Sequence, residues 1–488
     1  MFCCEQNYIV GILLLPLIIM GLQLAYSKQP RFRDAISIIT SGITFFLSSA
    51  FLLNFSDETT SVELFSLGHN LSITLKLDGL GSIFLFVASF LWFLTTIYSV
   101  GYMRKLKEHQ QTRFYNFFCL AIFATFGVLF SGNLLTLYLF YEILSFSTYP
   151  LVTHHQNNES KQSGRKYLAY IIGPSLCFTL PAMIIIYLLN GNLDFDQGFL
   201  VSNVQNSSGV ALYLLMLFGF SKAALIPLHS WLPAAMVAPT PVSSLLHAVA
   251  VVKVGVFSIL RITNDVFGID YLKTLQVFDV SFSTILCSIV AISILYPSFV
   301  ALSQNSLKRR LAFSTIGQLA YITMGAVLLT ELSLATSAVH IAMHAFSKIT
   351  LFFCVGAIYV AHHKKYLNEI SGLAYKMPIT FSAFAIGSLG VVGLPIAGGF
   401  ITKWNYLISS LSSENSWVAI VFILSSLLSA FYLFEVVLVG LKNKPKEKVQ
   451  MKEAPLLCLI PIVITAIMTI LLFFISTDLY NFAFMWVN

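Results

Sequence analysis

Long apolar stretches separated by polar connections fill most of this chain. A helix of about 20 apolar residues is long enough to cross the hydrocarbon core of a bilayer, and by that measure the pattern predicts about fourteen membrane-spanning helices. Their approximate centres are Leu17, Phe45, Leu91, Phe123, Leu144, Leu180, Phe218, Val252, Ile289, Gln318, Phe346, Gly390, Leu427 and Ile467. The connections are too short for a soluble domain, so we expect an all-α polytopic membrane protein.

The composition agrees with this class. Of the 488 residues, 57% are hydrophobic and 10% are charged, and the mean hydropathy is +0.83. Globular soluble domains carry about 25% charged residues. The first apolar stretch is preceded by Glu5 and by no basic residue, so we expect it to be a membrane helix rather than a cleaved signal peptide.

The basic residues alternate between the two sides of the predicted topology. If the N-terminus lies outside, most of the 28 Lys and Arg residues fall in inside loops, Arg310 among them, and Arg261 is one of the few left outside. An excess of Lys and Arg marks the cytoplasmic side of a membrane protein. We therefore expect a multi-pass protein of a bacterial inner membrane with both termini on the periplasmic side. The net charge of +7 follows from this topology and gives no reason to expect nucleic-acid binding.

Six charged residues fall inside the apolar stretches. A charged group at the bilayer centre costs at least roughly 2.5–3.5 kcal/mol and is tolerated chiefly where it faces a packed or wet protein interior. One such residue can be an accident of packing, but six indicate a route for ions or protons. They are Glu142, Lys222, Lys253, Lys348, Lys403 and Glu435.

The first group of these charges lies beside a predicted helix break. Pro227 follows Lys222 and should interrupt or kink its helix. Interrupted helices with exposed carbonyls recur at transport sites. Glu142 is the candidate counter-ion of Lys222, and Lys253 follows on the next span together with His247. The alternative is a static Glu–Lys link between helices, which would not need a second lysine nearby.

The second group includes a column of titratable side chains. His340, His344 and Lys348 follow one another at intervals of four residues, which places them on one face of a helix. Imidazoles titrate near neutral pH, so the column could pass protons. A metal site is the weaker interpretation, because no carboxylate or cysteine completes the set on this face. A purely structural polar stripe is the remaining alternative.

A second interrupted helix is predicted around Gly393 and Pro395, ahead of Lys403. The interval from Lys403 to Glu435 nearly equals that from Lys222 to Lys253. Each pair begins on an interrupted span and ends on the next, as two inverted repeats of a transporter would.

Other polar residues have no clear role. His229 and Trp231 could line an inner mouth or anchor the membrane interface. His154 and His155 are expected in a solvated loop. Cys3 and Cys4 could accept an acyl chain, although an ordinary pair at the membrane edge is favoured. The seven scattered cysteines predict neither disulfides nor an iron–sulfur cluster, and we expect no cofactor, no metal and no catalytic chemistry in this chain.

Four stretches of the chain resemble the proton-conducting antiporter family: residues 227–257, 141–149, 340–348 and 393–400. That family comprises the antiporter-like membrane subunits of respiratory complex I and the corresponding subunits of multisubunit, Mrp-type cation/proton antiporters. The resemblance implies about fourteen helices with two inverted five-helix repeats, each containing a broken helix. Applied to this chain, it gives N-terminal helices in residues 1–110, repeats in 111–262 and 280–441, and a C-terminal helix in 454–488.

The resemblance also implies roles for individual residues. Glu142 would pair with Lys222 on the first broken helix, and His247 and Lys253 would connect this pair to the centre. His340, His344 and Lys348 would form the central relay, and Lys403 the exit. Glu435 is the last candidate for a proton-transfer group.

The expected function is a proton-translocating subunit of a multisubunit Na⁺ or K⁺/proton antiporter, working with other membrane subunits. Lys403 stands where some complex I subunits use a carboxylate, and the sequence ends soon after the last apolar stretch, which favours a subunit of the antiporter D type. The alternatives are a proton-pumping subunit of a redox complex (an NADH:quinone oxidoreductase or a membrane-bound hydrogenase), a subunit of an inorganic-carbon uptake complex, and a stand-alone solute carrier.

Overall fold

The computed structural model describes residues 2–53, 61–195, 204–444 and 450–487. Helices dominate these ranges, which confirms the predicted all-α class. Sheet structure in the described ranges is limited to two antiparallel hairpins. One pairs β1 (Ser61–Gly68) with β2 (Leu71–Lys76), and the other pairs β3 (Gln276–Val277) with β4 (Val280–Ser281). The side chains of Cys3 and Cys4 lie outside the described part of the chain.

The helices follow one another with short connections. The first are α1 (Phe2–Ala25), α2 (Pro30–Leu53), α3 (Gly79–Lys105), α4 (Gln111–Leu129), α5 (Leu134–Val152), α6 (Asn158–Pro174) and α7 (Leu180–Asn190). The middle of the chain forms α8 (Asn206–Gly219), α9 (Trp231–Ala234), α10 (Thr240–Ser244), α11 (Val251–Arg261), α12 (Ile269–Thr274) and α13 (Phe282–Ser303). The last are α14 (Leu307–Val327), α15 (Glu331–His362), α16 (Pro378–Val392), α17 (Gly398–Leu411), α18 (Val418–Leu441), α19 (Leu456–Phe474) and α20 (Ser476–Val487).

Short helical segments of other types complete the fold. Three are π-helical: η1 (Ser175–Thr179) continues α6 into α7, η4 (Leu245–Val249) links α10 to α11, and η5 (Ile262–Phe267) extends α11. Four are 3₁₀ turns: η2 (Ser221–Ala223), η3 (Ala235–Val237), η6 (Leu367–Glu369) and η7 (Leu373–Tyr375). A π-helical turn inside an α-helix often marks a functional position.

Ten helices in the described ranges are long and apolar enough to cross a membrane, so the protein is multi-pass. The other four predicted centres, Leu144, Phe218, Gln318 and Gly390, lie in α5, α8, α14 and α16. Helices α8 and α16 are apolar but shorter, because an interruption follows each of them. The count of fourteen spans stays a prediction.

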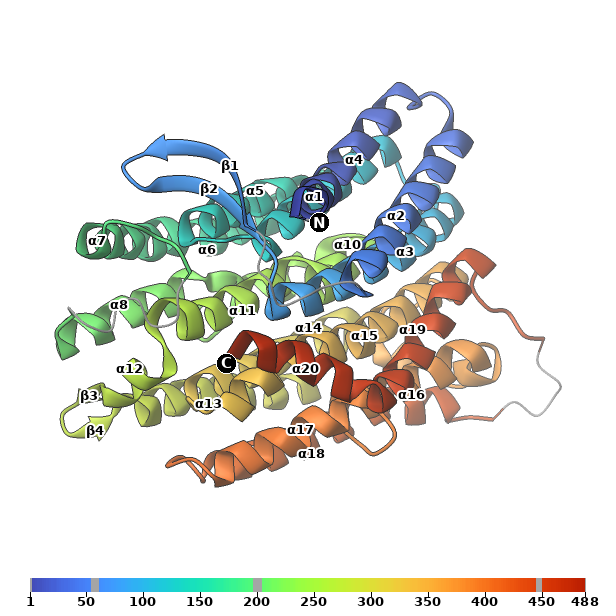
Figure 1. The fold of residues 1–488 in the computed structure, drawn as a ribbon. Coiled ribbons are helices and arrows are strands. Elements are labelled where there is room, and N and C mark those ends of the chain that lie inside the picture. The colour runs from blue at the N-terminus through green and yellow to red at the C-terminus, as the bar shows by residue number, and fades with distance from the viewer. Residues whose placement is uncertain (1, 54–60, 196–203, 445–449, 488) are drawn as a thin grey trace.

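Two helical spans form the centre of the bundle (Figure 1). The most apolar 18-residue windows of α15 and of the span from α10 to η5 are 100% buried, whereas those of α1 and α2 at one edge are 33% and 28% buried. Helix α15 packs against α3, α14, α16, α17, α19 and α20. The two central spans carry His247, Lys253 and the column on α15, so protein rather than lipid surrounds these polar groups.

The first helix break follows α8. This helix ends at Gly219, and the chain continues through the turn η2 and Ala224, whose φ of +57° is left-handed. Pro227 lies in the non-helical stretch before α9. The turn lies against α11, since a Cβ on Gly255 would lie 2.2 Å from the backbone nitrogen of Ala223.

The second break lies between α16 and α17. Helix α16 ends at Val392, and Gly393 takes a φ of +79°, a conformation that glycine adopts without strain. Pro395 lies in the following turn, and α17 begins at Gly398. A Cβ on Gly399 would lie 1.9 Å from the carbonyl oxygen of Gly390, so the two helix halves pack with their backbones in contact.

Arg261 is buried in the helical span, and its expected place in an outside loop is wrong. Its Nη2 donates to Asp78 Oδ1 at 2.8 Å, and its Nη1 donates to Asp265 Oδ2 at 2.8 Å and also to the other oxygen of Asp78. Asp78 caps the N-terminus of α3, and the indole of Trp486 on α20 donates to Asp265 at 2.9 Å. This ionic cluster therefore joins three distant segments of the chain.

Arg261→Leu should lower the stability of the protein, because it leaves two carboxylates without their counter-charge. Breaking a buried ion pair on one side costs about 3–5 kcal/mol. We expect thermal unfolding of the purified protein to begin at a clearly lower temperature. The matched control is Lys273→Ala, which removes an exposed pair with Asp270 (3.2 Å) and should change little. Equal melting temperatures for the two variants would contradict a structural role for the cluster.

Candidate functional site

Seven of the titratable residues predicted inside the membrane lie buried along the centre of the bundle. We call Lys222, His247, Lys253, His340, His344, Lys348 and Lys403 the polar axis. Each of these residues is at most 6% exposed. A buried amine or imidazole is costly unless it is hydrogen-bonded. The partners of each member therefore decide what the axis can do.

Lys222 is held at the first helix break by α5. Its amine donates to the carbonyl of Tyr141 at 2.8 Å and to the hydroxyl of Ser145 at 2.7 Å. The same nitrogen lies 3.0 Å from the centre of the Tyr141 ring, whose π face attracts a cation. The Tyr141 hydroxyl in turn accepts a hydrogen bond from the backbone N–H of Lys222 at 3.1 Å.

Glu142 lies next to this site but does not contact the lysine. The described ranges hold no ion pair within 4.0 Å between Glu142 and Lys222. One carboxylate oxygen accepts a hydrogen bond from Ser175, the first residue of the π-helical segment η1. The other oxygen has no hydrogen-bond partner among the described residues. Lys222 therefore contacts Tyr141, the residue before Glu142, and does not contact the expected counter-ion itself.

Lys253 joins the two central spans directly. Its amine lies 2.7 Å from Nδ1 of His344 on α15. His247 lies on η4, and its ring packs 4.6 Å from the ring of Phe352, centre to centre. Neither ring nitrogen of His247 has a hydrogen-bond partner within the described ranges. No hydrogen bond joins Lys222 and Lys253 in the described structure. The segments that carry them are in contact, because the turn η2 packs against α11.

The column on α15 has the predicted single face. The rings of His340 and His344 are stacked with centres 6.2 Å apart. His340 uses both nitrogens, Nδ1 with the Thr402 hydroxyl at 2.8 Å and Nε2 with the side-chain oxygen of Gln318 at 3.2 Å. Thr402 is the residue before Lys403, so the column leads to the second helix break.

Lys348 and Lys403 repeat the arrangement seen at Lys222. Lys348 donates to the hydroxyl of Ser314 at 2.7 Å. Lys403 donates to the hydroxyl of Ser426 at 2.9 Å and to the carbonyl of Val392, the last residue before the break, at 3.1 Å. Three of the four buried amines therefore have a serine hydroxyl as partner, and the fourth has an imidazole.

Glu435 lies away from the axis. Its carboxylate pairs with Arg310 at 2.5 Å, and its side chain is 44% exposed. Arg310 is buried in α14, where it also donates to the carbonyl of Tyr432 at 2.9 Å, so its expected place in an inside loop is wrong. This pair links α14 to α18.

The sequence did not point to the hydroxyl and amide partners of the axis. Ser145, Ser314, Gln318, Thr402 and Ser426 lie in apolar helices, and the only available signal is their polarity. Many serines and threonines in these helices bond to a carbonyl about one turn earlier, as Thr95 does at 2.6 Å, and Ser145 and Thr402 do so as well. Partner residues therefore cannot be told from ordinary ones without the fold.

Trp231 is buried and does not lie in an interfacial belt. Its indole donates to the carbonyl of Ser221 at 3.3 Å and its ring contacts Tyr167, so it packs behind the first helix break. His229 is partly buried against the ring of Tyr296. Their shared role at an inner mouth stays a prediction.

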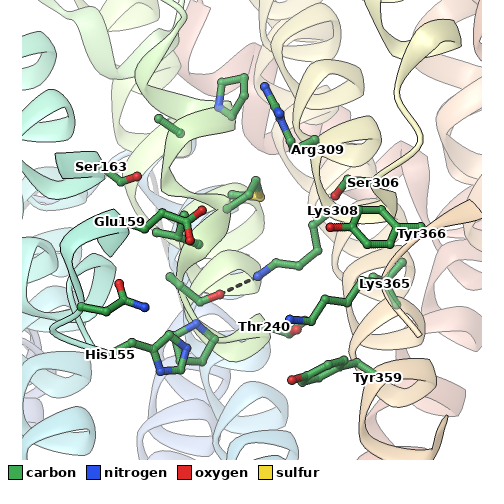
Figure 2. Close-up of a pocket in the computed structure, with 18 of the residues that line it drawn as sticks. His155, Glu159, Ser163, Thr240, Ser306, Lys308, Arg309, Tyr359, Lys365 and Tyr366 are labelled. Atoms are coloured by element: carbon green, nitrogen blue, oxygen red, sulfur yellow. Dashed lines mark hydrogen bonds between the residues drawn. The ribbon is translucent and has the colours of Figure 1, made fainter. Parts of the chain in front are cut away.

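A cavity of about 630 Å³ opens at the ends of α5, α14 and α15. Lys308 and Lys365 extend into it from one side and His155 and Glu159 from the other, as Figure 2 shows. Lys308 donates to the carbonyl of Ala238 at 2.5 Å, just before α10. The cavity therefore lies at the start of the span that carries His247 and Lys253.

His154, beside this cavity, is buried, and the expected solvated environment for it is wrong. The α3–α4 connection and the start of α4 cover the turn after α5: His109 Nε2 lies 3.1 Å from the His154 carbonyl oxygen, and Arg113 in the first turn of α4 donates to the same oxygen at 3.1 Å. Burial lowers the pKa of His154 to about 3, and neighbouring His109 and His155 add to this effect. His155 is partly exposed, and burial lowers its pKa as well.

The sequence model of the NADH:quinone oxidoreductase/Mrp antiporter transmembrane family matches residues 131–429. The model for the N-terminus of NADH-ubiquinone oxidoreductase (complex I) chain 5 matches residues 64–115. The N-type subunit of the NADH-quinone oxidoreductase of Desulforudis audaxviator is 33% identical over 374 residues, which cover 75% of this chain and 72% of that protein. The A-type subunit of the Na(+)/H(+) antiporter of Bacillus subtilis is 30% identical over 414 residues, 78% of this chain and 50% of that protein.

Solved structures share the fold. A chain in the Mrp complex from Dietzia superposes with a TM-score of 0.86 at 18% identity, covering 99% of this chain and 97% of that one. A chain of an archaeal membrane-bound sulfane sulfur reductase gives a TM-score of 0.86 at 21% identity, covering 98% of this chain and 96% of that one.

Fold and buried amines define a multi-pass membrane subunit of the antiporter-like class. The chain belongs to the NADH:quinone oxidoreductase/Mrp antiporter family.

Gly393→Ala should disturb the second helix break. Its φ of +79° strains a residue with a side chain, and the added Cβ would lie 2.5 Å from Cδ of Lys403. The left-handed conformation alone costs about 1–2 kcal/mol. We expect a lower melting temperature for the purified variant. Gly21→Ala, on α1 with nothing within 4 Å of its Cβ, should match or slightly exceed the parent protein. A stable Gly393→Ala variant would contradict this account of the break.

Proposed function

We propose that this chain is the proton-translocating membrane subunit of a multisubunit Na⁺ or K⁺/proton antiporter. Family membership supports a role in proton or cation transport, and the antiporter subunits among its relatives favour this member of the family. The observation that carries the proposal is the hydrogen bond of 2.7 Å between Lys253 and His344, which joins titratable groups of both central spans.

The partners of the lysines suit groups that change their charge. A hydroxyl can accept a hydrogen bond from an ammonium and can donate one to a neutral amine. Ser145, Ser314 and Ser426 therefore give Lys222, Lys348 and Lys403 a partner in either protonation state. A carboxylate in contact would instead hold each amine in its charged form.

The axis offers a sequence of proton carriers. A proton on Lys253 can pass to Nδ1 of His344, and an imidazole can release a proton from its other nitrogen. His340 is stacked on His344 and is hydrogen-bonded to Thr402, which leads to Lys403. Lys348 adds a branch through Ser314, whose hydroxyl also accepts from Tyr432 at 2.9 Å.

We assign Glu142 a regulatory role at the start of this route. It follows Tyr141, the residue that holds Lys222 through its carbonyl and its ring. A negative charge on Glu142, one residue from the group that binds Lys222, favours the charged form of the amine. Protonation of Glu142 would remove that preference. His247, which has no hydrogen-bond partner among the described residues, would connect the cavity at Lys308 to the other members of the polar axis. Glu435 has no place on this route, because it pairs with Arg310 near the lipid.

The same reasoning extends to the organisation of the chain. We propose that residues 111–262 and 280–441 form two inverted repeats, since each contains one helix break with a buried lysine beside it. The N-terminal residues 1–110 and the C-terminal residues 454–488 would flank them. Partner membrane subunits, a bacterial inner membrane and both termini on the periplasmic side complete the proposal.

A redox-driven proton pump is the second candidate. The relative that favours it is the Desulforudis oxidoreductase protein above, at 33% identity over 72% of its length. Both assemblies would use the same axis and differ in the partner chains. The subunits that co-purify with this chain from its native membrane therefore decide between them: small antiporter subunits support the first candidate, and redox subunits support the second.

Lys222→Ala, Lys348→Ala and Glu142→Ala should each reduce proton transport by roughly tenfold or more, because the lysines are proton-transfer groups and Glu142 sets the charge of Lys222. The measurement is cation-induced dissipation of a pH gradient in everted membrane vesicles that contain the complete assembly. The matched control is Lys442→Ala, an exposed lysine at the end of α18, which should transport normally. Full activity in all three variants at normal protein level would contradict the proposed route.

A further inference from the structure

A cluster of one carboxylate and three imidazoles lies beside the cavity that Lys308 and Lys365 line, away from the polar axis. Glu108 and His109 belong to the connection between α3 and α4, and His154 and His155 to the turn after α5. The ligand atoms of Glu108, His109 and His154 all lie within 4.8 Å of one another. The pair Glu108 and His109 is far in sequence from the pair His154 and His155, so the spacing of these residues does not predict a metal site.

The cluster converges on a single atom, Oε2 of Glu108. His154 Nε2 and His155 Nδ1 lie 3.8 Å from it, and His109 Nδ1 lies 4.0 Å from it. Ligand atoms around a tetrahedral zinc ion lie about 3.3 Å apart, given bond lengths of about 2.0–2.1 Å. The half-exposed His109 and the partly exposed His155 are the side chains that would move to close this difference.

The tautomer of His109 is already the one that binds a metal. Its Nε2 lies 3.1 Å from the carbonyl oxygen of His154, and a carbonyl can only accept, so Nε2 carries the hydrogen. In a neutral imidazole this leaves Nδ1, which faces Glu108, with a free lone pair. Metal-binding histidines commonly donate their other N–H to a carbonyl in this way.

His154 supplies a second, independent observation. Its side chain is 1% exposed, yet neither ring nitrogen has a hydrogen-bond partner in the described part of the chain. A buried polar group without a partner is costly and calls for a ligand. Glu108 and His155 line the cavity of about 630 Å³, which provides a way in, and His155 is visible at its wall in Figure 2.

We propose that Glu108, His109 and His154, with His155 as a fourth donor, bind a transition-metal dication of the zinc class. Three imidazoles and one carboxylate suit Zn²⁺, Cu²⁺ or Ni²⁺, whereas Ca²⁺ and Mg²⁺ require mainly oxygen ligands. The charged neighbours agree with this choice. Arg113 bonds to the His154 carbonyl and Lys308 and Lys365 line the far wall of the cavity, so positive charge opposes any dication, and binding has to come from the coordinate bonds of the imidazoles and the carboxylate. The bound metal would tie the α3–α4 connection to the end of α5.

The test is titration of the purified full-length protein, stripped with a chelator, first with Zn²⁺ and then with Co²⁺. We expect one equivalent of Zn²⁺ per chain and, for Co²⁺, the intense visible absorption bands of tetrahedral coordination. His109→Gln and His155→Gln alter half-exposed and partly exposed side chains, so they should fold and weaken binding by roughly tenfold or more each. His154→Gln should weaken binding at least as much.

The matched control is His69→Asn, an exposed histidine in the β1–β2 turn whose φ of +53° asparagine tolerates. Its Zn²⁺ affinity should equal that of the parent protein. The proposal is overturned if stoichiometric binding is absent, or if the His109 and His155 variants bind Zn²⁺ as tightly as the control. Binding is measured without proton transport, so this result stands independently of the proposed function.

Discussion

The cost of removing an amine from water governs this structure. Lys222, Lys253, Lys348 and Lys403 are buried in a bundle whose surroundings are hydrocarbon, and each must find a hydrogen-bond partner inside the protein. The chain meets that requirement with hydroxyls, carbonyls and one imidazole. Because carboxylates do not contact these lysines in the described ranges, their charge is not fixed by a neighbour. The same constraint confines the amines to the two central spans and the two helix breaks.

The helix breaks follow from that constraint. At the second break, the carbonyl of Val392 is freed from the helix ladder and accepts a hydrogen bond from Lys403, whose side chain also lies against the bare Cα of Gly393. At the first, the turn η2 carries Lys222 toward α5, where the carbonyl of Tyr141 receives its amine. An intact helix would offer neither the approach of Lys222 to α5 nor the free carbonyl of Val392. The π-helical segment η1 begins with Ser175, whose hydroxyl bonds to Glu142 beside the first of these sites.

Hydropathy was enough to predict the helical class and the buried positions of the four lysines and of His247, His340 and His344, and proline and glycine marked the two helix breaks. It could not assign Arg261 and Arg310, because an arginine near the end of a span looks the same in sequence whether it faces water or a carboxylate on another part of the fold. His154 was misplaced for a related reason: the polar residues around it suggest a loop, but His109 of the α3–α4 connection and Arg113 at the start of α4 cover it. The serine partners of the lysines also depend on packing between helices far apart in sequence.

The link between Lys253 and His344 is the most direct point at which to test the relay. Proton transport should be compared for Lys253→Met, His344→Gln and the double variant, in everted vesicles that contain the complete assembly. Two groups that act as one step are strongly non-additive when both are removed. The account predicts that each single variant loses most of its transport and that the double variant loses no more than the worse single one. Near-normal transport in either single variant, or losses that multiply in the double variant, would contradict a proton route through this hydrogen bond.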